Sequence, residues 1–155
     1  MKIRRAVAAD LDKYVVLAET FHAASPMKDA AKFDVKGYGD FFLSSLQNDS
    51  LGIWLAEIDG EMVGICGAIL YPLYFSPNSL VAQELWWWLT PKARGTGAGK
   101  MMFTQLESWA KERNASAMFM IALEDDRAGK MEKLYVRAGF KPIERTFMKE
   151  VTSWQ

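Results

Sequence analysis

The sequence predicts a mixed α/β domain in which helices cover both faces of a central sheet. Hairpin-forming segments come first, and a strand-helix-strand-helix-strand series follows them. The chain has 155 residues, of which 50% are hydrophobic and 25% are charged, the balance of a globular protein. Its length favours one domain, and no repeat, low-complexity tract or linker divides it. We therefore treat residues 1–155 as a single domain.

The first fifty residues favour a short strand and two helices. Residues 2–7 form the strand, and Asp10 opens an amphipathic helix that ends before the loop at Ser25-Pro26. Asp34 is suited to cap a second helix over 34–47. The apolar residues that follow helical spacing in the first helix are Leu11, Tyr14, Val15, Leu17, Ala18 and Phe21.

Three strands are expected in the middle of the chain. Residues 51–58 and 61–71 flank Asp59-Gly60, a strong hairpin signal between apolar runs. Residues 62–83 carry no charge, but prolines interrupt them. We therefore expect two buried strands, over 61–71 and 80–90, which a turn at 76–79 joins, and no membrane span.

The last third of the sequence predicts two more helices and two more strands. The helices cover 98–113 and 130–138, and Gly139 ends the second of them. The strands cover 117–123 and 141–151. The residues of the first helix that we expect to face inward are Met101, Met102, Leu106, Trp109 and Ala110.

Charge and cysteine content exclude several classes of function. Nineteen basic residues balance nineteen acidic ones, which argues against nucleic acid or an anionic membrane as a partner. One Cys and one His do not supply the ligands of a zinc site, so no metal is expected. The single Cys and the lack of an apolar export signal after the basic start fit the cytoplasm.

A glycine-rich turn over 89–100 is the most informative segment. It lies between a predicted strand and a predicted helix, where several backbone amides converge and the helix start adds partial positive charge. Arg94 and Lys100 add full charges, so the turn is suited to a phosphate or pyrophosphate. A P-loop would need glycine at Arg94 and Ser or Thr at Met101, and a dinucleotide fingerprint would need glycine at Lys100. A simple flexible turn with a helix cap is the alternative.

The pattern Arg94-x-x-Gly97-x-Gly99 resembles the acyl-CoA pyrophosphate loop of the GNAT superfamily of N-acetyltransferases. The resemblance extends upstream to Trp88-Leu89-Thr90-Pro91 and downstream to the run from Leu134 to Phe140, which is similar to a Tyr-x-x-x-Gly-Phe signature. The order of elements matches over essentially the whole chain. The resemblance implies a mixed, mostly antiparallel sheet of six to seven strands.

This resemblance implies acetyl-CoA as co-substrate and direct acetyl transfer to a primary amine, without a metal. The strand before the loop would splay from its neighbour, and the backbone of Trp88, Leu89 and Thr90 would hold the pantetheine arm. The amide of Leu89 would donate to the thioester carbonyl. The residues whose amides would hold the pyrophosphate are Arg94, Gly95, Thr96, Gly97, Ala98, Gly99 and Lys100.

Two residues are candidates for proton transfer. Glu84 is the carboxylate on the strand before the loop, about one position from the family's glutamate, and a β-bulge shifts facing by one residue. A strand-end carboxylate facing solvent or a basic residue is the alternative. Tyr135 stands where the family's thiolate-protonating tyrosine lies, and packing between helix and sheet is its alternative role. Ala128 replaces a small polar residue that the family commonly has about seven positions earlier.

The acceptor side is less defined. The loop between the first two helices commonly forms a substrate wall in this superfamily, which makes Phe21, His22 and Ser25 weak substrate candidates. A small metabolite, a polyamine, an antibiotic, a peptide N-terminus and a protein lysine all remain open as acceptor. Cys66 lies in an apolar strand and is expected to be an inert core thiol.

Two other functions stay open. A non-catalytic acyl-CoA-binding module would keep the loop and lack the base. An interaction domain would instead use the run Trp86-Trp87-Trp88, for which burial, an aromatic pocket and a dimer contact are the readings. The resemblance also allows a homodimer.

Overall fold

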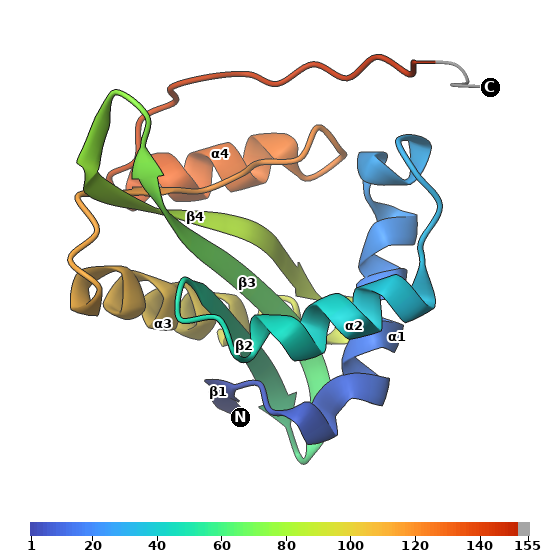
Figure 1. Ribbon diagram of the computed structural model, residues 1–155. Helices are drawn as coiled ribbons and strands as arrows, with labels where there is room; N and C mark the ends of the chain where they lie inside the picture. The colour runs from blue at the N-terminus through green and yellow to red at the C-terminus, as the bar shows by residue number, and fades with distance from the viewer. Residues whose placement is uncertain (152–155) are drawn as a thin grey trace.

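The computed structural model describes residues 1–151 and shows a sheet with helices on both faces (Figure 1). Its strands lie in the order β1-β2-β3-β4-β5, and only β4 and β5 are parallel neighbours. The strands are β1 (Lys2–Arg5), β2 (Leu51–Ile58), β3 (Glu61–Leu73), β4 (Ser76–Leu89) and β5 (Ala117–Phe119). The predicted mixed α/β class is confirmed, although residues 1–151 form five strands and not six or seven.

The helices begin close to the predicted caps. They are α1 (Leu11–Ala24), α2 (Val35–Ser45), α3 (Ala98–Glu112) and α4 (Ala128–Arg137), with short 3-10 helices η1 (Ala8–Asp10), η2 (Pro26–Asp29) and η3 (Pro91–Ala93). The Asp34 carboxylate accepts the Gly37 amide at 2.9 Å and so caps α2 as expected. Asp10 ends η1 and accepts the Val7 amide at 2.8 Å. Across residues 1–151, no helix is long and apolar enough to cross a membrane.

Two hydrophobic cores lie on opposite faces of the sheet. One is packed under α3 and contains Cys66, Met102 and Leu106, which confirms the expected buried position of the thiol. The other is packed under α1 and α2 and contains Trp86 and Trp88. Met101 does not face inward as expected, because it is 39% exposed and lies beside the stripe formed by Ala98, Met102 and Leu106.

The two central hairpins differ in how well the sequence predicted them. Asp59 and Gly60 form the expected turn between β2 and β3, both with positive φ (51° and 80°). The next turn lies at Tyr74-Phe75 and not at 76–79. Leu73 already pairs with Ser76, and Pro77 falls in an irregular stretch before Leu80, where a proline does not have to donate to the ladder.

The C-terminal part departs most from the prediction. β5 ends at Phe119, and residues 141–151 form no strand in the described chain but run alongside α4 (Figure 1). β5 has three residues, so its edge is too short to pair with a strand over 141–151. Phe147 is 88% exposed, so burial does not stabilise a strand there either.

Candidate active site

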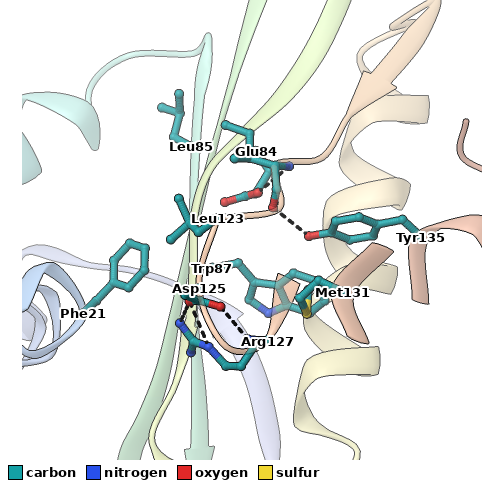
Figure 2. Close-up of a pocket in the computed structure, with 10 residues that line it drawn as sticks. Phe21, Glu84, Leu85, Trp87, Leu123, Asp125, Arg127, Met131 and Tyr135 are labelled. Carbon is teal, nitrogen blue, oxygen red and sulfur yellow. Dashed lines mark hydrogen bonds and ion pairs between the residues drawn. The ribbon is translucent and has the colours of Figure 1, made fainter. Parts of the chain in front are cut away.

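A pocket opens where β4 and β5 separate. The two strands pair only from Val81 to Gln83, opposite Ala117 to Phe119, and the chain after β5 then diverges toward α4. Figure 2 shows the side chains that line the resulting gap. These are Phe21, Glu84, Leu85, Trp87, Ile121, Leu123, Asp125, Arg127, Met131 and Tyr135. Three predicted site residues, Phe21, Glu84 and Tyr135, therefore meet in one pocket.

A β-bulge in β4 sets the direction of Glu84. Ala68 pairs with Glu84 and Gly67 pairs with Trp86, so Leu85 is the extra residue. Opposite residues of an antiparallel pair share a face, and Ala68 belongs to the core under α3. Regular alternation would place Glu84 on the face of Trp86, which packs under α1 and α2. The bulge instead turns the carboxyl to the opposite face.

Glu84 is a buried acid with one backbone partner. Glu84 is only 4% exposed, and its Oε2 accepts a hydrogen bond from the Ile121 amide at 3.0 Å. Burial penalises the charged form and raises the pKa of Glu84 to about 7, while the hydrogen bond from Ile121 opposes that rise. The group therefore changes protonation near neutral pH, which is the range in which a general base works well.

Tyr135 lies on α4 and points toward Glu84 (Figure 2). Its hydroxyl donates to the Ile121 carbonyl at 3.0 Å. Burial, and then the nearby Glu84 carboxyl, raise the pKa of Tyr135 above its ordinary value, so the phenol stays protonated at neutral pH. A protonated hydroxyl at the edge of the pocket is able to act as a proton donor.

The end of β4 presents the backbone of Leu89 to the gap. The Thr90 amide donates to Val63 of β3 at 2.9 Å, and backbone direction alternates along a strand, so the amide and carbonyl of Leu89 point away from β3. The Leu89 carbonyl accepts Nε of Arg94 at 3.2 Å on that side. The buried Thr90 hydroxyl has no hydrogen-bond partner among residues 1–151.

The glycine-rich turn leads from β4 into α3. Gly95 and Gly97 have φ of 80° and 93°, values that favour glycine, and Gly97 is the N-cap of α3. The first amides of a helix have no partner inside it, which applies here to those of Gly99 and Lys100. The Ala98 amide instead donates to the Thr96 hydroxyl at 3.4 Å. A Cβ on Gly99 would lie 3.4 Å from the side chains of Leu89 and Trp87, which shows how closely α3 approaches β4.

The remaining acceptor-side candidates do not gather in this pocket. Only Phe21 does, and its ring also lies 5.5 Å from that of Trp88. The His22 Nε2–H donates to the Ala31 carbonyl at 2.9 Å in a separate groove beside α2. Ser25 is buried, and its hydroxyl accepts the Met27 amide at 2.9 Å, so it caps η2.

Among the pocket residues that sequence reasoning did not identify are Ile121, Asp125 and Arg127. The Asp125 carboxylate accepts the Arg127 amide at 2.8 Å and pairs with the Arg127 guanidinium. Ile121 contributes its backbone amide and carbonyl, and the identity of its side chain does not indicate this role. The spacing Asp125-x-Arg127 was the available signal, because an Asp side chain commonly accepts the backbone amide two residues later.

Comparisons with known proteins show the family of this chain. The model of the acetyltransferase (GNAT) family matches residues 16–140. An uncharacterized N-acetyltransferase from Archaeoglobus fulgidus is 34% identical over 117 residues, which cover 74% of this chain and 76% of the relative.

Two solved structures have the same fold at lower identity. A transcriptional regulator from Bacillus halodurans C-125 superimposes with a TM-score of 0.78 at 19% identity, over 97% of this chain and 99% of its own. The structure of AAC(6')-Iy in complex with the bisubstrate analog CoA-S-monomethyl-acetylneamine gives 0.73 at 19% identity, over 98% of each chain. The family match and the archaeal relative together show that this chain belongs to the GNAT family of acetyltransferases.

Proposed function

We propose that the protein transfers an acetyl group from acetyl-CoA directly to a primary amine, in the pocket between β4 and α4. The observation that carries the proposal is a buried acid with a pKa of about 7, Glu84, facing a protonated tyrosine, Tyr135, where two parallel strands separate. A CoA-containing bisubstrate analog bound to a structural neighbour supports the choice of donor.

The residues present fit acetyl-CoA. The amides at the start of α3 and the guanidinium of Arg94 suit its pyrophosphate. Once its carbonyl releases Nε of Arg94, the backbone edge at Leu89 suits the amide groups of the pantetheine arm, which would bind as an added strand. The buried, unpartnered Thr90 hydroxyl lies at the same end of β4 and lacks the hydrogen bond that a bound molecule would provide.

Glu84 would serve as the base, either directly or through a water molecule. An alkyl ammonium ordinarily titrates near pH 10. It must lose a proton before its nitrogen can attack, and a carboxylate buried beside the pocket accepts that proton more readily than an exposed one. Its pKa of about 7 means that the required charged form becomes dominant above neutral pH.

Tyr135 and Leu89 would complete the site. When bound, acetyl-CoA supplies a reactive acetyl thioester. The Leu89 amide would stabilise negative charge on the thioester oxygen, since it points into the gap and a positioned amide is effective in a water-poor site. The Tyr135 hydroxyl would leave its Ile121 acceptor and donate its proton to the departing sulfur.

Calorimetric titration with acetyl-CoA tests the loop assignment. We expect micromolar binding by the wild type and its loss in the double variant Arg94→Ala, Gly97→Ala, since alanine is strained at a φ of 93° and the guanidinium is removed. Lys92→Ala is the matched control, because Lys92 is a neighbouring basic residue that pairs with Glu61 outside the pocket. A folded wild type that does not bind acetyl-CoA would overturn the proposed function.

An amine screen with detection of released thiol then tests catalysis. Polyamines, aminoglycosides, peptide N-termini and lysine peptides represent the acceptor classes that the sequence leaves open. Thiol release with any of them supports the enzyme. Tight acetyl-CoA binding without turnover on any amine would favour the non-catalytic binding module instead.

A further inference from the structure

Two arginines from different segments of the chain pack against one tryptophan. Arg94 follows β4, and Arg127 is the N-cap of α4. Their guanidinium carbons lie 4.7 Å and 5.1 Å from the centre of the Trp88 ring. The ring of Trp88 thereby contacts one arginine that follows β4 and another at the start of α4.

Asp125 holds Arg127 in this position. Its carboxylate accepts the Arg127 backbone amide at 2.8 Å and the side-chain Nε at 3.1 Å, and it also pairs with Nη2. A guanidinium has five N–H donors in a planar fork, so an edge remains for another acceptor. Arg127 is also among the residues that line the pocket.

The charged side chains around Trp88 do not balance one another. Two guanidinium groups lie against one buried ring, and Asp125 is the pocket-lining carboxylate beside them. Asp126 approaches Arg127 only at 3.9 Å, and its side chain is 94% exposed to water, which screens it. Two positive groups against one carboxylate leave a net positive charge around Trp88, which an anion would offset.

We propose that Arg127 is a second phosphate-binding residue, which contacts the pyrophosphate of acyl-CoA from the α4 side while Arg94 and the amides of α3 contact it from the other. Asp125 is the residue that positions it. This assignment rests on the proposed function, because it names a partner for the same donor. Guanidinium groups are suited to this task, since their paired N–H groups match phosphate oxygens.

Calorimetric titration with CoA tests this assignment. Arg127→Gln should raise the Kd for CoA about tenfold, the loss expected for one charge-assisted contact. Arg127→Lys should recover part of the affinity, because it keeps the charge but not the fork. Arg137→Gln is the matched control, since Arg137 is an exposed arginine near the other end of the same helix. Thermal unfolding of each variant reports whether it is folded.

Salt separates phosphate contact from a merely structural role. The ratio of Kd values between Arg127→Gln and the wild type should shrink as sodium chloride is raised, because an ionic contact is screened. Wild-type affinity in Arg127→Gln, or a loss that does not change with salt, would overturn the role of Arg127 and leave the proposed function standing. A wild type that does not bind CoA would overturn both.

Discussion

Glu84 and Tyr135 are hydrogen-bonded to the same residue of the chain. The Ile121 amide donates to the Glu84 carboxyl, and the Ile121 carbonyl accepts from the Tyr135 hydroxyl, each at 3.0 Å. A strand, the segment after β5 and a helix are thereby joined at one point of the backbone. The proposed base and the proposed acid are thus fixed relative to each other before any substrate arrives.

Replacement of the acid by its amide, Glu84→Gln, should remove the base. The wild-type kcat/KM should rise through about pH 7, because the carboxyl loses its proton there. The variant should lose this rise, with activity about 10²- to 10⁴-fold lower on its alkaline side. Steady-state rates across a pH series check this, with Glu107→Gln as a control that removes a carboxylate paired with Lys111 on α3. An unchanged profile would exclude Glu84 from the mechanism.

The same substitution should also change how stability depends on pH. The pKa of Glu84 is raised from 4.5 to about 7 on folding, so the folded state binds its proton more tightly than the unfolded state. The contribution of Glu84 to the free energy of unfolding is therefore largest below pH 4.5 and declines as the pH rises to about 7. The decline amounts to about 3 kcal/mol.

Thermal unfolding at two pH values measures that decline. Glutamine does not titrate, so the Tm of Glu84→Gln relative to the wild type should be higher at pH 8 than at pH 5. Taking the Tm difference between the two proteins at each pH cancels the effects of pH on all other groups. An equal Tm difference at both pH values would show that Glu84 is not buried as a titrating acid.

Tyr135→Phe should separate catalysis from donor binding. The phenyl ring keeps the packing of α4, but it cannot protonate the departing sulfur, so kcat should fall about 10²-fold or more. The Ile121 carbonyl also loses its donor, at a cost of about 1 kcal/mol in the free energy of unfolding. Calorimetry should find the Kd for acetyl-CoA unchanged. A normal kcat would assign Tyr135 to packing alone.

The sequence predicted the fold best where the signals were local. The Asp59-Gly60 turn and the Asp34 cap depend on neighbours within a few residues, and both are found as expected. The sequence predicts a strand over 141–151, yet a strand also needs an edge to pair with. The length of β5, which is set by its divergence from β4, is not visible in either segment by itself.

The candidate site shows the same division. Glu84, Tyr135 and the glycine turn were recognisable because each lies in a sequence pattern, and the pocket brings Glu84 and Tyr135 together. The direction of Glu84 depends on the bulge at Leu85, and alternation alone places it on the wrong face. The contact of Arg127 with Trp88 joins residues that are distant in sequence, so no local pattern indicates it.

Gly67 should prove essential for the position of the tryptophan run. A Cβ at this position would lie 2.1 Å from Cζ2 of Trp86, whose ring covers the strand there. The indole has little room to move, because Tyr38 and Phe41 pack edge-on against it and the residue is only 8% exposed. Gly67→Ala should therefore lower the free energy of unfolding by about 2–3 kcal/mol.

Chemical denaturation of Gly67→Ala beside Gly129→Ala tests this. Gly129 lies in α4 with no atom within 4 Å of an added Cβ, so alanine there should be neutral or should stabilise by up to about 1 kcal/mol through helix propensity. A loss confined to Gly67→Ala would show that contact with Trp86 is the cause. Because Trp86 follows the bulge that turns Glu84, the same variant should also lower kcat/KM, and equal stability of the two variants would contradict this account of the strand.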